Sequence, residues 1–272
     1  HVGLLMENTP EYLLALLGAA GRGITTVGLN TTRRGEELRR DILHTDCAVV
    51  LTDPAGAPLL RDLDLRATSV FDVTDTPWAS ALAAASAAPP SPAPSVGPAD
   101  PLLLIFTSGS TSAPKAVIMS HGRAARMAEA ASWFGSDDVL YCAMPLFHGN
   151  ALNAIVFPAL ATGATIAVRE RFSASQFFDD LRRYGATFFT SVGRALGYVL
   201  ATPERPDDRE HAVKFALAPE SSPADVREFR RRFGITCVAG YGSSENAVIF
   251  VPVPGMPRDA LGRPQDGIEA AV

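Results

Sequence analysis

A run of small hydroxyl and glycine residues followed by a lysine carries the clearest chemistry in this 272-residue sequence. The run consists of Thr107, Ser108, Gly109, Ser110 and Thr111. Lys115 follows a few residues later, directly after Pro114. Backbone N–H groups and hydroxyls donate hydrogen bonds to phosphate oxygens, and a lysine neutralises part of the phosphate charge. The pattern therefore predicts a loop that holds the polyphosphate of a nucleoside triphosphate.

The common P-loop pattern, G-x-x-x-x-G-K-[ST], does not fit this lysine. Lys115 is preceded by Pro114 rather than glycine, and it is followed by Ala116 rather than serine or threonine. We therefore do not expect a kinase or GTPase of the P-loop class.

The elements that must position this loop are short apolar strands that alternate with helices. The apolar run Leu102–Phe106 predicts a buried strand before the loop, and a second apolar run begins at Ala116. Other expected strands are Val2–Met6, Ile24–Leu29, Ala48–Leu51, Asp138–Ala143, Thr165–Val168, Ala186–Thr190, Val213–Ala218 and Cys237–Gly240. Expected helices are Glu11–Gly21, Arg34–Thr45, Arg123–Trp133, Ala151–Ala161, Ser173–Tyr184, Val192–Leu200 and Ser222–Phe233. This alternation predicts a layered α/β fold with doubly wound, mainly parallel sheets packed with helices.

An Ala-, Pro- and Ser-rich stretch, 81–101, predicts an exposed connector between two subdomains. The first subdomain is expected at 1–80, and the second, which binds the nucleotide and the acyl group, at 102–272. The sequence opens in a strand-like run and stops on an alternating pattern. We therefore expect a piece of a longer enzyme that is incomplete at both ends.

Composition excludes several classes of protein. Hydrophobic residues make up 47% of the chain, which is enough for a sizeable core, and the net charge of −5 argues against a nucleic-acid-binding face. Basic clusters at 33–34, 39–40 and 230–232 lie beside acidic residues and predict solvated helix faces. The three cysteines lack metal-ligand spacing, and no apolar run approaches the ~20 residues that span a membrane. We expect reduced thiols and a cytoplasmic location, with membrane association left open.

The lysine-containing loop resembles the phosphate loop of the adenylate-forming superfamily, T-S-G-[ST]-T-G-x-P-K-G. The sequence matches that pattern at the five residues of the run and at Pro114 and Lys115. It departs from the pattern at two glycines, which are Ser112 and Ala116 here. The resemblance implies that the loop binds ATP, with Thr111 and Lys115 acting on the phosphates.

A second segment, AGYGSSE at 239–245, resembles the Y-G-x-[ST]-E motif of the same superfamily. The resemblance assigns Tyr241 to stacking on adenine, with Gly242 beside it in the nucleotide site. It assigns Ser244 to a phosphate contact and Glu245 to Mg²⁺. These residue types suit the roles, because an aromatic ring covers a flat base and Mg²⁺ prefers hard oxygen ligands.

Two further segments complete the implied site. FALAPESSPADVREF at 215–229 resembles a stretch whose strand end forms the other wall of the adenine slot; this implies Ala218, Pro219 and Glu220. MPLFHGNAL at 144–152 matches in part a region that borders the acyl pocket, which implies His148, with Val192 as a second pocket residue. A structural histidine is the alternative for His148.

PERPDD at 203–208 and LGRP at 261–264 resemble bacterial fatty-acyl-CoA ligases related to fatty-acid transport proteins. The resemblance implies that Lys115, Thr111 and Glu245 support attack of a fatty acid or other carboxylate on ATP, after which coenzyme A displaces AMP. It also implies a small C-terminal domain, which this sequence lacks, so the piece alone is expected to turn over little. A non-catalytic nucleotide-binding module and an enzyme for aryl or amino acids are the alternatives. A homodimer and a peripheral contact with lipid stay open.

Overall fold

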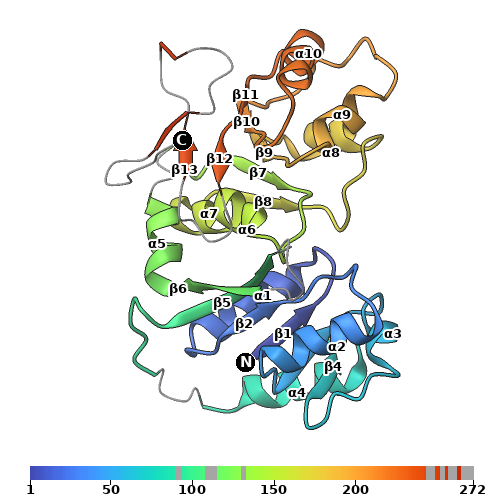
Figure 1. Cartoon of the computed structure of the whole chain (residues 1–272), viewed down its shortest axis with the longest axis vertical. Helices are drawn as coiled ribbons and strands as arrows, with labels where there is room; N and C mark the ends of the chain where they lie inside the picture. Colours follow the sequence, from blue (N-terminus) through green and yellow to red (C-terminus); the bar gives the residue numbers. More distant parts are fainter. Residues whose placement is uncertain are drawn as a thin grey trace. The chain divides into compact units, whose positions relative to one another are not determined.

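The computed structural model describes residues 1–89, 94–107, 115–129, 133–242, 249–251, 255–256 and 262–264. The chain forms two compact units. The first consists of His1–Arg126 and Pro145–Gly149, and the second of Met127–Met144 and Asn150–Val272. Each unit contains a mainly parallel sheet covered by helices, which confirms the predicted α/β class (Figure 1).

The first unit is built on a six-stranded sheet in the order β4-β3-β1-β2-β5-β6. The strands are β1 (Val2–Leu5), β2 (Thr26–Gly28), β3 (Val49–Thr52), β4 (Ser69–Asp72), β5 (Pro101–Thr107) and β6 (Lys115–Ser120). Neighbouring strands are parallel except for β6, which returns antiparallel to β5. The five parallel strands therefore end at one edge of the sheet.

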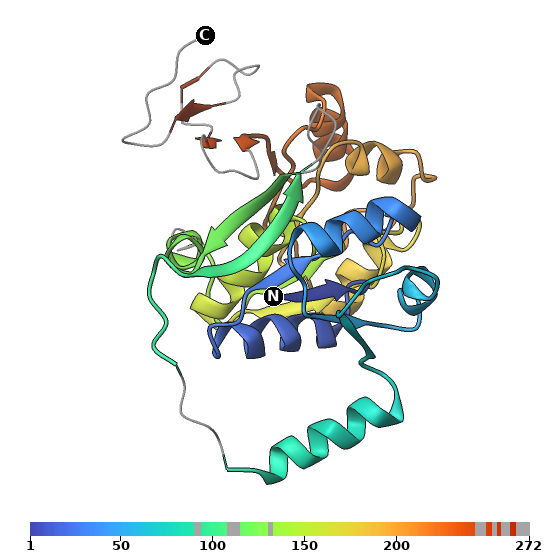
Figure 2. The ribbon, with the colours of Figure 1, turned by 60° about the horizontal axis from the view of Figure 1, so that its bottom comes forward.

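Helices lie on both faces of this sheet. They include α1 (Pro10–Ala20) and α2 (Gly35–His44). The chain also forms α3 (Ala57–Leu60), α4 (Thr76–Ala87), which buries none of its residues, and α5 (His121–Glu129), which follows β6. Thr9 caps α1 by accepting a hydrogen bond from the Tyr12 backbone N–H, and Pro10 starts the helix, as sequence reasoning expects. Figure 2 shows α1 and α2 on opposite faces of the sheet. Leu5 packs in the cluster that includes Leu38 of α2, so alternate residues of β1 serve the two faces.

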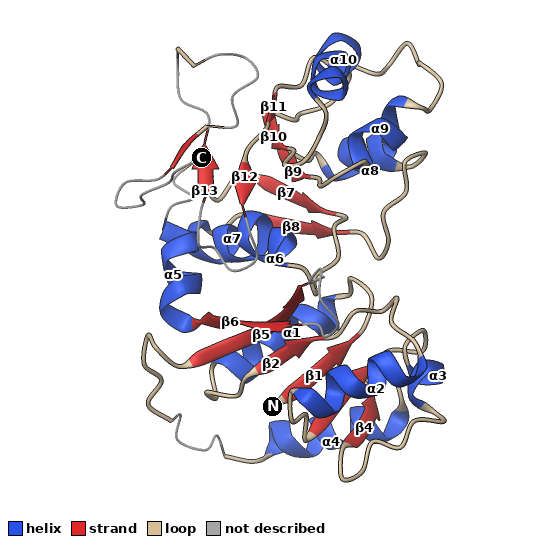
Figure 3. Ribbon diagram, in the orientation of Figure 1, coloured by secondary structure: helices blue, strands red, loops and turns tan. Residues whose placement is uncertain are grey.

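The second unit contains a five-stranded parallel sheet in the order β11-β10-β9-β7-β8. Its strands are β7 (Val139–Cys142), β8 (Thr165–Val168), β9 (Phe188–Thr190), β10 (Phe215–Leu217) and β11 (Cys237–Val238). A small antiparallel sheet follows, with β12 (Tyr241–Gly242), β13 (Ile249–Val251) and β14 (Arg263–Pro264), as Figure 3 shows. The chain adds β8 on one side of β7 and β9 on the other, so the direction of winding switches between β7 and β9.

Helices again cover both faces of the five-stranded sheet. One face carries α8 (Phe177–Tyr184), α9 (Ala195–Leu200) and α10 (Pro223–Phe233), which share an apolar core with the sheet (Figure 1). The other face carries one continuous run: α6 (Gly149–Ala151), a π-helical segment η1 (Leu152–Val156) and α7 (Phe157–Thr162). The run ends at Gly163, whose φ of +75° suits a residue without a side chain.

The phenylalanines of β9 show which residues face which helices. Phe188 packs against Phe134 and Phe215, whereas Phe189 packs against Phe177 and Phe229. Because side chains alternate along a strand, Thr190 lies on the Phe188 face and Ser191 on the Phe189 face. The two residues that end this strand therefore point to opposite sides of the sheet.

Three features differ from the sequence-based expectations. The helix expected at 151–161 contains the π-helical segment, and neither β4 nor the full length of α4 was anticipated. The segment 81–101 lies within the first compact unit, because β5 pairs with β2 and joins the first sheet. The expected subdomains 1–80 and 102–272 stay a prediction about independently folding parts.

The expectation of solvated basic faces is wrong for one residue. Arg232, in the last turn of α10, is buried and pairs with Asp208 at 2.6 Å. Its guanidinium also donates to the backbone carbonyls of Thr202 and Pro203. Within the described part of the chain, none of the helices has the length and apolar character needed to cross a membrane.

Candidate functional site

The first unit holds the two ends of the predicted phosphate loop side by side. Thr107, the last residue of β5, pairs with Lys115, the first residue of β6. Thr107 is half-buried and Lys115 is exposed at the end of the hairpin. The expected buried strand before the loop is confirmed, because Leu103 and Ile105 are almost fully buried. Ser108, Gly109, Ser110 and Thr111 lie outside the described residues.

The same unit positions His148 on a segment that is fixed to β2 and to the end of β1. The backbone N–H of Leu146 donates to Oδ1 of the buried Asn8 at 2.8 Å. A Cβ on Gly28 would lie 3.1 Å from Cα of Phe147, so a side chain at Gly28 would push this segment away. Glycine at this point of β2 therefore allows the segment to lie close against the strand.

His148 itself is open to solvent although protein surrounds much of its ring. Its backbone N–H donates to the carbonyl of Pro145 at 3.0 Å, and its ring centroid lies 4.6 Å from that of Phe147. Desolvation lowers the pKa of His148 below its ordinary value. The imidazole is therefore kept neutral at physiological pH, as a hydrogen-bonding rather than a charged group.

The second unit brings several predicted site residues to the carboxyl edge of its parallel sheet. Beyond β9 and β10 the chain stays paired: the N–H of Ser191 donates to Leu217 O at 2.9 Å, and the N–H of Gly193 donates to Pro219 O at 3.3 Å. Val192 lies between these two bonds. The predicted pocket residue and the predicted adenine wall are therefore adjacent.

The adjoining strand adds Tyr241 and Gly242 to this edge. The N–H of Ala218 donates to Val238 O at 2.9 Å, and the chain continues from β11 to Tyr241, whose side chain is 48% exposed. Glu220 has a φ of +63°, a strained conformation for a residue with a side chain, and it is exposed. Ser244 and Glu245 lie outside the described residues. Ligands of open α/β sheets bind at this edge, where the winding switches.

Sequence reasoning missed four polar residues at the same edge: Asn150, Asn153, Thr190 and Ser191. Thr190 Oγ1 donates to Asn150 Oδ1 at 3.0 Å. The Oδ1 atom of Asn153 and the Oγ atom of Ser191 are buried without a hydrogen-bond partner among the described residues. The available signal was the presence of two carboxamides in an otherwise apolar helix, which is not a recognised motif.

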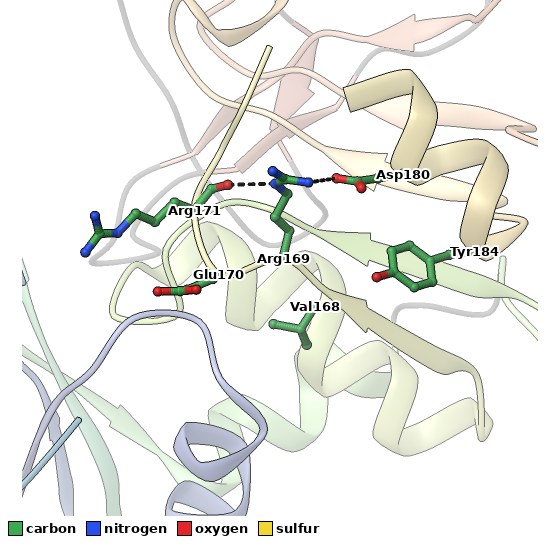
Figure 4. Close-up of a pocket in the computed structure, with 6 residues that line it drawn as sticks. All are labelled: Val168, Arg169, Glu170, Arg171, Asp180 and Tyr184. Carbon is green, nitrogen blue, oxygen red and sulfur yellow. Dashed lines mark hydrogen bonds and ion pairs between the residues drawn. The ribbon is translucent and has the colours of Figure 1, made fainter. Parts of the chain in front are cut away.

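A separate open pocket of about 450 Å³ lies at the carboxyl end of β8, and none of the predicted site residues line it (Figure 4). Its lining residues are Val168, Arg169, Glu170, Arg171, Asp180 and Tyr184. Asp180 accepts hydrogen bonds from Arg169 at 2.5 Å and from the buried Tyr141 hydroxyl at 2.8 Å. Burial, reinforced by Asp180, raises the pKa of Tyr141. These charged groups satisfy one another and hold α8 to the sheet.

Over the described residues, no group of three or more His, Cys, Asp or Glu side chains is placed to hold a metal ion. The one predicted metal ligand, Glu245, falls outside that part of the chain.

The fold and this edge define a class of protein. The model of the AMP-binding enzyme family matches residues 1–272, and the chain belongs to that family. It is 49% identical over 269 residues to the steroid-22-oyl-CoA synthetase of Rhodococcus jostii (strain RHA1), an alignment that covers 97% of this chain and 48% of that protein. It is 42% identical over 276 residues to the medium/long-chain-fatty-acid–CoA ligase FadD17 of Mycobacterium marinum (strain ATCC BAA-535 / M), covering 99% of this chain and 53% of that protein.

A solved structure agrees with the fold. The N-terminal domain of FACL13 from Mycobacterium tuberculosis superposes with a TM-score of 0.76 at 22% identity, covering 92% of this chain and 65% of that one. The predicted membership in the adenylate-forming superfamily is confirmed, as is the likeness to bacterial acyl-CoA ligases. The chain spans about half the length of the curated relatives it matches.

Proposed function

We propose that the protein containing this chain activates a carboxylic acid with ATP and transfers the acyl group to coenzyme A. The observation that carries the proposal is the convergence of Val192, Ala218–Glu220 and Tyr241 at one carboxyl edge in a chain of the AMP-binding family. A carboxylate is a poor electrophile, so it is first converted to an acyl-adenylate with release of pyrophosphate. The thiol of coenzyme A then attacks the acyl carbon and AMP leaves.

The chain's own residues would bind and orient the reactants. Lys115 and the loop that starts at Thr107 would neutralise and hold the β- and γ-phosphates, since phosphoryl chemistry needs positioning and charge stabilisation above all. Tyr241 would cover one face of adenine, with the wall Ala218–Glu220 on the other. Ala218 itself is fully buried in the apolar core, so Pro219 and Glu220 are the residues of this wall that are open to a ligand.

Glu245 is the residue we propose for Mg²⁺. A protein usually holds Mg²⁺ with only one or two carboxylates, and the phosphates and water supply the remaining oxygen ligands. Bound there, the ion would neutralise phosphate charge. The assignment is supported by the Y-G-x-[ST]-E pattern at 241–245.

Two acid classes are candidates for the substrate. A medium- or long-chain fatty acid is favoured by the name of the Mycobacterium marinum relative, and a steroid carboxylate by that of the more similar Rhodococcus jostii relative. A homodimer and a peripheral contact with a lipid surface remain predictions.

Pyrophosphate release by the complete protein tests the proposal. The acids should run from acetate to long-chain fatty acids and include a steroid carboxylate, each with ATP, Mg²⁺ and coenzyme A. We expect Glu245→Gln to remove most Mg²⁺-dependent adenylation, on the order of 10²-fold or more, by analogy with the loss of one group that stabilises the transition state. The control is Glu210→Gln, which removes an exposed carboxylate from the 201–212 loop and should leave the rate unchanged. Full activity in Glu245→Gln would show that the metal is held elsewhere.

A non-catalytic nucleotide-binding module is the second candidate, favoured by the two substituted loop glycines, Ser112 and Ala116. Calorimetry with ATP and Mg²⁺ separates the two functions. Binding without pyrophosphate release from any acid would favour the module.

A further inference from the structure

Two polar side chains meet, and a third lies on the same helical run, where the winding of the five-stranded sheet switches. Asn150 and Asn153 come from the helical run that follows β7, and Thr190 ends the neighbouring strand β9. Thr190 is 2% exposed, and its hydroxyl donates to Asn150 Oδ1 at 3.0 Å. This bond occupies the carboxamide oxygen of Asn150, so the NH₂ group of that side chain is the part left to face a ligand.

Asn153 lies three residues further along the same helical run. Its Oδ1 atom is buried and has no hydrogen-bond partner among the described residues. A flip of the Asn153 carboxamide would exchange its oxygen and nitrogen atoms, and a polar atom would still lie at this buried position. Burying a polar atom without a partner is unfavourable, so a bound group that satisfies it would be stabilised.

The backbone around Asn153 has the form often found at functional sites. The segment Leu152–Val156 is π-helical, and the N–H of Phe157 donates to Leu152 O. Single π-turns within α-helices are frequent at functional sites. Three other residues of this segment, Leu152, Ile155 and Val156, are buried and apolar, whereas Asn153 is half-buried. Asn153 is therefore a partly accessible polar residue beside an apolar helix face, and ligands of such sheets bind at the carboxyl edge.

We propose that Asn150 and Asn153 bind a hydroxyl group on the acyl part of the substrate, so that the protein prefers a hydroxylated carboxylic acid to a plain alkanoic acid. The inference rests on the proposed function. A hydroxyl both donates and accepts, and it can therefore donate to Asn153 Oδ1 while accepting from the Asn150 NH₂ group. The two carboxamides are three residues apart on one helical run, and we infer that one hydroxyl lies between them. A ketone could satisfy only the NH₂ group, and an alkyl chain neither.

The test is the specificity of the complete protein for matched acids. The panel consists of decanoic acid, its 3-, 5-, 7- and 9-hydroxy derivatives and the corresponding oxo acids, measured as kcat/KM for ATP-dependent pyrophosphate release. We expect at least one hydroxy acid to exceed decanoic acid by about tenfold, the value of one well-placed hydrogen bond. The oxo acid of the same position should fall between them. Decanoic acid equal to or better than every hydroxy acid would overturn the inference.

Asn153→Leu keeps the size of the side chain and removes its polar atoms. We expect the ratio of kcat/KM for the hydroxy acid to that for decanoic acid to fall to about one. A urea unfolding midpoint no lower than that of the unmodified protein shows that the variant is folded. Thr190→Val removes the hydrogen bond that orients the Asn150 side chain, so it should lower the ratio by a smaller factor. It tests the same inference through a second residue.

Thr162→Val is the matched control, because Thr162 lies at the far end of the same helical run and its hydroxyl is bonded to Pro158 O. It should leave the ratio unchanged. A ratio that persists in both Asn153→Leu and Thr190→Val would overturn the inference while leaving the proposed function intact. Pyrophosphate release with none of the acids, including those of the wider panel, would overturn the proposed function and this inference together.

Discussion

The two edges of the five-stranded sheet differ in whether their buried polar groups are hydrogen-bonded. At the amino edge, just before β7, the side chain of Asp138 is 5% exposed and fully engaged. Thr187 and Lys214 donate to its Oδ1 atom, each at 2.7 Å, and the Gly135 N–H donates to Oδ2 at 2.9 Å. At the carboxyl edge, Ser191 Oγ and Asn153 Oδ1 are buried without partners among the described residues.

Arg232 and Glu220 show the same difference between the amino and carboxyl edges of the sheet. Arg232 at the amino edge donates five hydrogen bonds, to Asp208, to the carbonyls of Leu200, Thr202 and Pro203 and to the Thr202 hydroxyl. At the carboxyl edge, Glu220 adopts a positive φ of 63°, a strained conformation for a residue with a side chain. Satisfied polar groups stabilise the native state, whereas strain and unpaired groups tend to gather at functional sites. The amino edge therefore stabilises the unit, and the carboxyl edge has the features of a binding site.

The strongest test of this contrast is to break the buried pair at the amino edge. Arg232→Met leaves Asp208 as an uncompensated buried carboxylate, because their side chains are only 4% and 8% exposed. We expect a loss of about 3–5 kcal/mol in the free energy of unfolding. Urea unfolding followed by Trp133 fluorescence in a Trp78→Phe background measures it, since Trp133 packs on Phe215 within the second unit.

Arg231→Met is the neighbouring control. Arg231 pairs with Glu228 and Glu204 on the surface, where its side chain is 57% exposed. Removing it should leave the free energy of unfolding nearly unchanged, because solvent screens exposed ion pairs. Equal losses in the free energy of unfolding of the two variants would show that the buried pair of Arg232 and Asp208 stabilises the unit no more than a surface pair. The inferred difference between the two edges would then be wrong.

The second prediction uses pH to isolate the charge of Asp138. Burial alone would raise the pKa of Asp138, but the hydrogen bonds from Lys214, Thr187 and the Gly135 N–H outweigh it and lower the pKa. A carboxyl group with a lowered folded-state pKa stabilises the protein above its ordinary pKa of about 3.9. That contribution disappears as the pH falls through the lowered value.

Asp138→Asn should therefore cost about 1–3 kcal/mol at pH 7, and progressively less as the pH is lowered from about 4 towards the folded-state pKa. Asp137→Asn, which changes the exposed neighbour, should leave the stability unchanged at each pH. The measurement is the urea midpoint at a series of pH values. A constant loss across the series would assign the effect to shape rather than to charge.

Local signals account for the parts of the fold that the sequence could predict. Thr9 and Ser222 each precede a proline and cap a helix, so α1 and α10 begin where expected. The apolar runs before Thr107 and after Pro114 form the hairpin that holds the ends of the predicted loop. Each of these features depends on neighbours within a few residues, which is why the pattern sufficed.

Contacts between distant segments could not be predicted in this way. The pairing of β5 with β2 joins residues 77 apart, such as Thr26 and Leu103, and it moves the hairpin into the first unit. The sequence predicts that Arg232 is solvated like its two neighbours, but the fold buries it beside Asp208, which is distant in the sequence. The carboxamides of Asn150 and Asn153 acquire meaning only because Thr190 and the switch between β7 and β9 lie beside them.

The smallest expected change in the free energy of unfolding comes from removing hydroxyls on either side of β9. Thr187→Val removes a hydroxyl that donates to Asp138 and accepts from the Val139 N–H at 3.1 Å, so it should cost about 1–2 kcal/mol. Ser191→Ala removes a buried hydroxyl that has no partner among the described residues, so the free energy of unfolding should stay the same or rise by up to about 1 kcal/mol. Both are read from the urea midpoint under identical conditions. A loss in Ser191→Ala as large as that in Thr187→Val would mean that the hydroxyl of Ser191 is bonded in the folded protein, and the carboxyl edge would then be as well satisfied at this strand as the amino edge.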